Sequence, residues 1–472
     1  MLYITHDLWK ASLKAQFNAA AAGMEAASLA MRLGMPFSFA PQANKHWADT
    51  LSASAEILER ATREYPKPEF GLTTTQIGER TIKVTEEDVL DRPYCTLKRF
   101  KRDTDRNDPK VLLVAPMSGH YATLLRDTVK ELLPHHDVYI TDWKDARDVP
   151  LSEGSFGLED YVTYLRDFMH TLGPQAHVVA VCQPTVPTLA AVSLMAEDND
   201  PCQPVSMTLM AGPLDTRIAE TEVNRYAKTH PIEWFERTVT DFVPPWYAGA
   251  GQRVYPGFVQ LGGFVTMNPD RHWNAHKELY EHRSHGEHAQ ADKIAQFYDE
   301  YNAVCDLPAQ FYLETVKQIF QDHALPLGKM TWKGRVIDPS KITKTSIFTV
   351  EGSKDDITAP LQTESVHLMC KNLPAGMKFH YLQEGAGHYG VFGGRRWREH
   401  ISPRITGFIR ASAARESLVH SAIPCDNMTN GAPLIHPCRW DAVKTDKSLF
   451  SLYNRDGGRD GKKDGNSPFS PR

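Results

Sequence analysis

Cysteine is scarce in this chain of 472 residues, and the few cysteines are scattered without any CxxC spacing. An odd and dispersed set argues against the disulfide framework of a small secreted domain and against a zinc ribbon. We therefore expect free thiols in a reducing compartment. The cysteines are Cys95, Cys182, Cys202, Cys305, Cys370, Cys425 and Cys438.

A long hydrophobic run is also absent. The most apolar stretch, residues 178 to 195, is interrupted by Gln183, Pro184 and Pro187. Such a stretch suits a buried strand and helix better than a bilayer, so we predict no membrane span. The N-terminus MLYITHDLWKASLK lacks the basic start, apolar core and small-residue cleavage site of a secretory signal. A cytoplasmic location is therefore expected.

Neither sign of charge is in clear excess, since Lys and Arg number 53, Asp and Glu number 58, and the net charge is -5. With no long basic run, there is no electrostatic case for a nucleic-acid partner. The segment EHRSHGEHAQ carries His282, His285 and His288, but their spacing drifts around a helix that Gly286 weakens, and no HExxH pattern exists. A solvated helix face is favoured over a metal site, so we predict no metal and no cofactor.

Short β-branched runs alternate with helical segments from residue 111 onwards. Near-continuous apolar strands separated by helices predict a parallel sheet that is covered on both faces. The expected fold class is therefore α/β and doubly wound. The runs are VLLVAP (111–116), VYITDW (138–143), VVAV (178–181), VSMTLMAG (205–212), SIFTVEG (346–352) and KFHYL (378–382).

The alternation stops between Gly212 and Ile337, where the sequence is aromatic and mostly helical in pattern. An insertion of this size between two sheet strands predicts a cap over their carboxyl ends. The last residues, NRDGGRDGKKDGNSPFSPR, cannot bury enough apolar surface to order, so disorder is expected. The predicted organisation is a helical N-terminal extension (1–100), a core in two pieces (101–214 and 338–416), a helical cap (215–337) and a disordered tail (417–472).

Cys182 follows directly on the strand VVAV and precedes a predicted helix. A strand-to-helix turn is where α/β-hydrolases present their nucleophile, and the helix dipole there stabilises a thiolate. The positions two before and two after it are Ala180 and Pro184, and proline is tolerated in a first helical turn. A cysteine in this place is by itself more often inert core, so the prediction of a nucleophile depends on its partners.

The partners follow two later strands. Asp355 and Asp356 come after SIFTVEG, where a carboxylate can orient a histidine, while Asp215 follows the strand VSMTLMAG. Asp355 is the first choice as the acid, Asp356 is the close alternative and Asp215 is third. His388 lies in the glycine-rich loop QEGAGHYGVFGG after KFHYL and is the predicted general base. The order nucleophile, acid, histidine is that of an α/β-hydrolase.

Backbone donors for an oxyanion are expected at two places. The N–H of Gln183, directly after the nucleophile, is the first, and the loop after VLLVAP offers Met117 or Ser118 as the second. His120 in that loop allows a substrate contact, although a lone loop histidine is more often solvated.

Four segments together resemble the intracellular poly(3-hydroxybutyrate) depolymerases, a thiol subgroup of the α/β-hydrolases: VVAVCQPT, TLMAGPLDTR, EGSKDDI and EGAGHYGVFGGRRW. The similarity runs from Met1 to about Glu416. It implies Cys182, Asp355 and His388 as catalytic residues that cleave stored polyester to 3-hydroxybutyrate oligomers or monomer through a thioester. It also implies a polyhydroxybutyrate granule or polyhydroxybutyrate oligomers as substrate, association with storage granules, and granule-associated proteins as possible partners.

Two alternatives stay open at this point. Polyhydroxyalkanoate synthases have a related fold with Cys, Asp and His, and they transfer acyl groups from 3-hydroxyacyl-CoA. Synthases usually flank the cysteine with glycine-type residues, whereas Gln183 and Pro184 follow it here, which favours hydrolysis. The second alternative is a non-catalytic granule-binding protein that keeps the fold.

Overall fold

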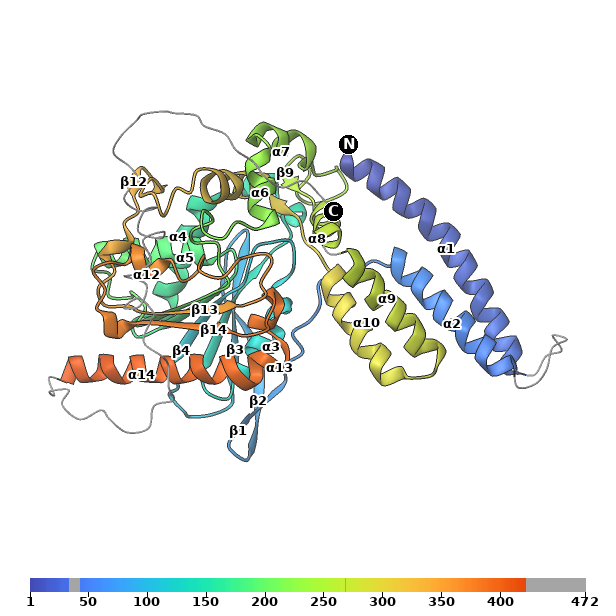
Figure 1. Cartoon of the computed structure of the whole chain (residues 1–472), viewed down its shortest axis with the longest axis horizontal. Coiled ribbons are helices and arrows are strands. Elements are labelled where there is room, and N and C mark those ends of the chain that lie inside the picture. Colours follow the sequence, from blue (N-terminus) through green and yellow to red (C-terminus); the bar gives the residue numbers. More distant parts are fainter. Residues whose placement is uncertain (34–42, 268, 422–472) are drawn as a thin grey trace, which may run out of the picture.

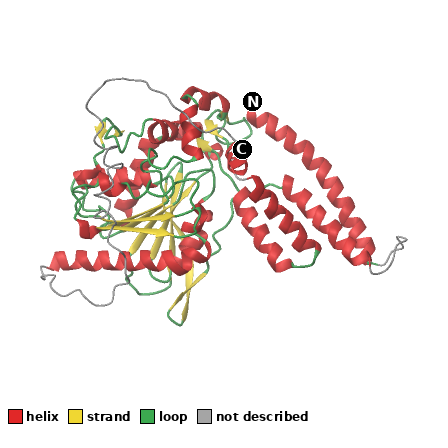
Figure 2. Ribbon diagram, in the orientation of Figure 1, coloured by secondary structure: helices red, strands yellow, loops and turns green. Residues whose placement is uncertain are grey.

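A nine-stranded sheet lies at the centre of the computed structural model, which describes residues 1–33, 43–267 and 269–421 (Figure 2). All neighbouring strands from β5 to β14 are parallel, and β1, β2 and β3 join them as antiparallel neighbours. In spatial order the strands are β1 (Thr74–Ile77), β2 (Arg80–Asp91), β3 (Cys95–Arg102), β5 (Asp137–Trp143), β4 (Lys110–Val114), β6 (His177–Val181), β7 (Ser206–Met210), β13 (Ser346–Gly352) and β14 (Lys378–Gln383).

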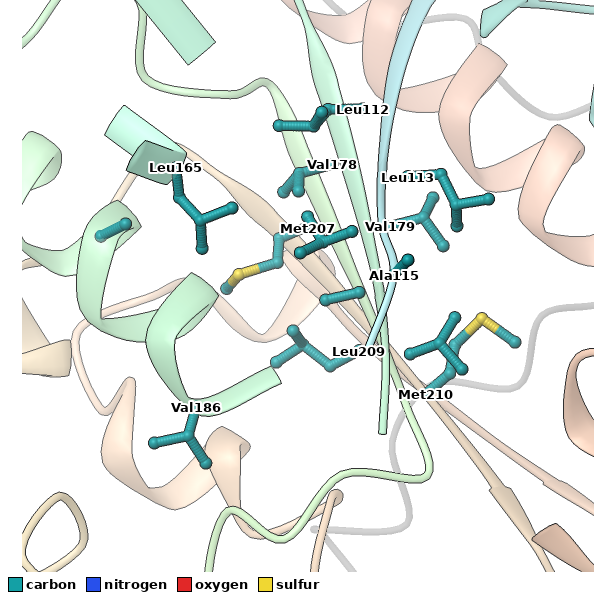
Figure 3. Packing of buried hydrophobic residues seen from close by; sticks show 14 of the residues in the cluster. Leu112, Leu113, Ala115, Leu165, Val178, Val179, Val186, Met207, Leu209 and Met210 are labelled. Atoms are coloured by element: carbon teal, nitrogen blue, oxygen red, sulfur yellow. The ribbon is translucent and has the colours of Figure 1, made fainter. Parts of the chain in front are cut away.

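The central strands are buried because helices cover both faces of the sheet. Every residue of β6 and β7 is buried, as expected for near-continuous apolar strands. Leu112, Val178 and Met207 are register partners on three neighbouring strands, and they meet Leu165 of α4 on one face (Figure 3). The predicted α/β-hydrolase fold is confirmed.

Helices α3 and α14 contact each other on one face, where α14 also contacts β7 and β13, whereas α4 and α5 pack together against β4 and β6 (Figure 1). The helices of the sheet layers are α3 (Arg126–Leu132), α4 (Leu158–Leu172), α5 (Thr185–Glu197), α12 (Val366–Met369), α13 (Gly394–Arg396) and α14 (Ser402–Ser421). Among the residues that the structure describes, none of the helices combines the length and apolar character that crossing a bilayer requires.

The N-terminal part differs from the helical extension to residue 100 that the sequence pattern predicted. Two long helices, α1 (Leu2–Arg32) and α2 (Ala43–Thr62), lie side by side, but the chain from Thr74 to Arg102 forms β1, β2 and β3 of the main sheet. Only Val84 is buried in the twelve residues of β2. Apolar alternation is limited to Ile82 and Val84, and charged residues dominate the rest of the strand, so the strand signal in the sequence is weak.

The segment between β7 and β13 holds six α-helices and two small sheets within its described residues. Helix α9 packs against α2 and α10, so α1, α2, α9 and α10 together form a projection at one side of the sheet (Figure 1). The elements are α6 (Glu222–Thr229), α7 (Ile232–Thr238), α8 (Gly257–Met267), α9 (Pro269–Ser284), α10 (His288–Asn302), α11 (Ala309–Thr315), β8 (Asp241–Phe242), β9 (Arg253–Tyr255), β10 (Leu307–Pro308), β11 (Thr331–Trp332) and β12 (Arg335–Val336). Its role as a cap domain stays a prediction.

The start of α1 is tied to this inserted segment. The buried hydroxyl of Tyr3 donates a hydrogen bond to the carboxyl of Asp306, and burial raises the pKa of Asp306 to about 7. At the other end of the described chain, α14 continues to Ser421, and the remainder of the predicted tail lies outside the described residues.

Candidate active site

Cys182 occupies a tight turn between the last residue of β6 and the first residue of α5. Its φ is +68°, a left-handed conformation that non-glycine residues rarely adopt and that is frequent at functional sites. The Cys182 N–H donates to the carbonyl of Met210 over 2.7 Å, and the Thr185 hydroxyl donates to the Cys182 carbonyl over 2.8 Å. Bonds from β7 and α5 therefore hold the strained turn, which has the form of a nucleophile elbow.

The elbow also depends on a glycine in the neighbouring strand. A Cβ added at Gly212, just beyond β7, would lie 1.9 Å from the Thr185 hydroxyl. The absence of a side chain at Gly212 thus lets the first turn of α5 approach the end of β7. Pro184 directly precedes the first residue of α5, where its missing N–H costs no helical hydrogen bond.

Asp355 and His388 meet at the carboxyl ends of β13 and β14. His388 Nδ1 lies 2.8 Å from Asp355 Oδ2, and the side chains are 7% and 0% exposed. The other carboxylate oxygen of Asp355 accepts the N–H groups of Ile357 and Thr358 over 3.0 and 2.9 Å. Three hydrogen bonds therefore orient the carboxylate on the imidazole, which leaves Nε2 for another partner.

Cys182 lies near enough to His388 to raise the pKa of its imidazole. Of the acids considered from the sequence, Asp355 contacts His388, whereas Asp356 is exposed and Asp215 pairs with Arg217 over 2.8 Å. The structure thus brings the three predicted residues together. Their catalytic roles stay predictions.

The surroundings of His388 raise its pKa in the folded protein. Burial lowers the pKa of His388, but the Asp355 carboxylate and then Cys182 raise it, and the net pKa lies well above its ordinary value. A cationic imidazole between a carboxylate and a sulfur is the arrangement that stabilises a thiolate nucleophile.

The raised pKa of His388 predicts a pH-dependent stability. A group with a folded pKa above its unfolded value stabilises the fold fully below the unfolded pKa, about 6.5 for histidine, and loses that contribution as pH rises through the folded pKa. We expect the difference in unfolding free energy between wild type and Asp355→Asn to shrink as the pH is raised above neutrality. Urea unfolding at a series of pH values measures it; a difference that stays constant would contradict the expectation.

Three predicted oxyanion donors are present as unused amides. Within the described residues, the backbone N–H groups of Gln183, Met117 and Ser118 donate no hydrogen bond. Met117 is buried and Ser118 partly buried in the loop after β4. Unpaired amides at the end of a strand suit an oxyanion, which arrives only with the reaction. Their assignment to an oxyanion hole stays a prediction.

The loop after β4 is fastened to the inserted segment by a seam that the sequence did not reveal, formed by Gly119, His120, Tyr301, Val304 and Cys305. The Cys305 N–H donates to the Gly119 carbonyl over 2.8 Å, and His120 and Val304 form a β-bridge. His120 Nε2 lies 3.0 Å from the Tyr301 carbonyl. Against the expectation of a solvated side chain, His120 is buried, and burial lowers its pKa to about 4.

The seam predicts that Gly119→Ala impairs turnover. Gly119 has a φ of +92°, and an added Cβ would lie 2.6 Å from Oε1 of Gln260, a side chain with little room to move at 4% exposure. We expect about a tenfold loss of turnover and about 1–2 kcal/mol of stability, because the loop must shift. Gly78→Ala is the control, since Gly78 has a φ of +61° but an open surrounding. It should lose stability while keeping turnover; equal turnover for both variants would contradict the role of the seam.

Among the described cysteines, Cys182 differs from the buried ones. Burial raises the pKa of Cys95, Cys305 and Cys370, so their thiols stay protonated. Cys182 is partly exposed and lies at the elbow beside His388. Cys425 and Cys438 lie outside the described residues.

Two groups of side chains elsewhere in the described chain have metal-ligand character. One is Glu351, Glu364 and His380, but the Glu351 carboxylate already accepts three backbone N–H groups from residues 361–364, which makes it a structural anchor for that loop. The other is His170, Asp200 and Cys202. The predicted histidine-rich segment spans the end of α9 and the start of α10, and there His282 bonds Glu287.

Residues 211–413 match the family model described as PHB de-polymerase C-terminus. The match includes Asp355 and His388 but begins after Cys182. It supports a relationship to the polyhydroxybutyrate depolymerases and the cleavage of carboxylic esters. No significant match was found among curated proteins.

Three solved structures with a similar chain path are distant in sequence. A monoacylglycerol lipase from Paleococcus ferrophilus is 12% identical, with a TM-score of 0.39 and coverage of 67% of this chain and 99% of that chain. A 2-hydroxy-6-oxo-6-phenylhexa-2,4-dienoate hydrolase from Rhodococcus sp. strain RHA1 is 14% identical, with a TM-score of 0.38 and coverage of 70% and 99%. A meta-cleavage product hydrolase from Pseudomonas fluorescens IP01 is 13% identical, with a TM-score of 0.40 and coverage of 70% and 98%. Nothing about activity follows from similarities of this extent.

Proposed function

We propose that this protein is an intracellular polyhydroxybutyrate depolymerase that cleaves the polyester through a Cys182, His388 and Asp355 triad. The observation that carries the proposal is the 2.8 Å contact of His388 with Asp355 beside a partly exposed cysteine at a strained elbow. The family match at residues 211–413 supplies the substrate class, an aliphatic polyester. The protein would then work in the cytoplasm on storage granules, together with any granule-associated proteins.

Acylation begins when the Cys182 thiol transfers its proton to Nε2 of His388. The Cys182 sulfur attacks the ester carbonyl, and the N–H groups of Gln183 and of Met117 or Ser118 hold the negative charge on oxygen. The ester C–O bond then breaks as His388 gives its proton to the departing alkoxide. A polyester chain with a free hydroxyl end leaves, and a hydroxyacyl thioester remains on Cys182.

Deacylation reverses the roles of the same groups. His388 takes a proton from water, the hydroxide attacks the thioester carbonyl, and the C–S bond breaks to release the carboxylic acid and the cysteine. Asp355 keeps the Nδ1 proton of His388 on the side away from the sulfur through the 2.8 Å bond, so Nε2 is the nitrogen that exchanges protons. No further group is needed for the proton balance.

Synthesis of the polymer is the second candidate, because a thiol, a histidine and an aspartate also serve acyl transfer from 3-hydroxyacyl-CoA. The residues after the cysteine favour cleavage, since Gln183 and Pro184 stand where synthases usually have glycine-type residues. Purified enzyme incubated with native granules, and separately with 3-hydroxybutyryl-CoA, decides between them. Soluble hydroxybutyrate from granules supports cleavage; release of CoA without soluble hydroxybutyrate would overturn it. Binding to granules with neither product would indicate a scaffold.

A further inference from the structure

The side-chain amide of Gln183 is buried without hydrogen-bond partners. Gln183 is 8% exposed, and both Nε2 and Oε1 are buried without a partner. Among the described residues it is the one side chain in which two buried polar atoms are unpaired. Buried carboxamides are nearly always hydrogen-bonded, because an unpaired one forfeits its bonds to water without compensation.

The position of Gln183 in the chain indicates which ligand would pair its amide atoms. It directly follows Cys182, and its backbone N–H is unpaired as well. The residue next to the predicted nucleophile in the chain therefore has an unpaired side-chain donor, an unpaired side-chain acceptor and an unpaired backbone donor. Side chains that serve only the fold use such groups inside the protein, as the Glu351 carboxylate does with the N–H groups of Leu361, Thr363 and Glu364.

We propose that the Gln183 carboxamide binds the polyester and the hydrolytic water, a role that rests on the proposed function. An ester polymer offers carbonyl acceptors along its length and no donor except its hydroxyl end. Nε2 therefore donates to a substrate carbonyl, and Oε1 accepts from the water that cleaves the thioester. Both atoms are shut off from solvent in this structure, so the side chains that cover them shift when substrate enters.

The proposal predicts that Gln183→Met separates stability from activity. Methionine matches the length of glutamine and leaves no polar group unpaired, so the apparent melting temperature should stay equal or rise. At the same time kcat/KM on a soluble hydroxybutyrate trimer should fall about tenfold or more, the effect of losing one or two hydrogen bonds to the reacting complex. Pre-steady-state release of nitrophenol from p-nitrophenyl butyrate adds a second readout, in which the deacylation rate should fall more than the acylation burst.

Thr208→Val is the matched control. The Thr208 hydroxyl is also buried and unpaired, but it lies within β7, inside the sheet. Its removal should leave the melting temperature equal or higher and kcat/KM within about twofold.

The outcomes separate the two proposals. A Gln183→Met variant that melts lower would show that the amide supports the fold, and one with unchanged kcat/KM and deacylation would show that it touches no reactant; either result overturns the inference. If the wild type releases no hydroxybutyrate from the trimer, the proposed function fails. The comparison of acylation and deacylation on p-nitrophenyl butyrate then still tests Gln183.

Discussion

Cys182→Ala should abolish release of hydroxybutyrate from polymer, with turnover lower by about 10⁴-fold or more. In the proposed mechanism alanine removes the atom that forms the thioester, and neither His388 nor Asp355 can replace it as a nucleophile. The fold should persist, because the turn is held by the Cys182 backbone N–H on Met210 and the Thr185 hydroxyl on the Cys182 carbonyl. Circular dichroism checks the fold, and chromatography of soluble products measures the loss.

Cys202→Ala is the control for this loss. Cys202 is partly exposed like Cys182, but it lies in the loop after α5, and burial raises the pKa of its thiol. Its replacement should leave turnover unchanged. Iodoacetamide should modify Cys182 faster than Cys202 and the buried cysteines, because Cys182 is partly exposed whereas burial raises the pKa of the other thiols. Full activity in Cys182→Ala would show that another residue is the nucleophile.

Asp355→Asn should lower turnover by about 10⁴-fold, the loss known when a triad acid becomes an amide. An asparagine side chain can donate its N–H to Nδ1, which moves the ring proton to Nε2 and removes the base. The two N–H groups from Ile357 and Thr358 can still bond the remaining carbonyl oxygen, so the loop should keep its shape. Steady-state rates across pH and a melting curve separate a chemical loss from a folding loss.

Asp356→Asn is the control for Asp355, since it changes the adjacent and exposed carboxylate by the same single group. We expect a change within about twofold, as for surface positions without a catalytic contact. A larger loss of turnover in Asp356→Asn than in Asp355→Asn would identify Asp356, not Asp355, as the triad acid.

The strands β4, β5, β6, β7 and β13 could be predicted from sequence because they are almost entirely buried and therefore read as unbroken apolar runs. β2 could not, since only Val84 is buried in it and charged residues occupy half of its positions. The elbow at Cys182 and the loops of Asp355 and His388 followed from strand ends, which the topology of a parallel sheet brings to one edge.

Contacts between residues far apart in the chain could not be predicted from the sequence pattern. The bond from Cys305 to Gly119 joins positions far apart, and no local periodicity reports such a pair. His120 was expected to be solvated because nothing in the loop sequence indicates its contact with the distant Tyr301 carbonyl. In the fold His120 is buried and makes that contact. The unpaired amide of Gln183 likewise became visible only when its surroundings were known.

The seam has a consequence for the order in which this protein becomes an enzyme. During synthesis the loop after β4 leaves the ribosome early. The Gly119 carbonyl cannot form its hydrogen bond until Cys305 has been synthesised. The first turn of α1 forms its contact equally late, because the Tyr3 hydroxyl donates a hydrogen bond to Asp306, which lies 303 residues further along the chain. Closing such loops is slow relative to local structure. The nascent chain therefore presents the Cys182 thiol well before the loop after β4 is held in place and before His388 is made, so the predicted triad assembles only near the end of folding.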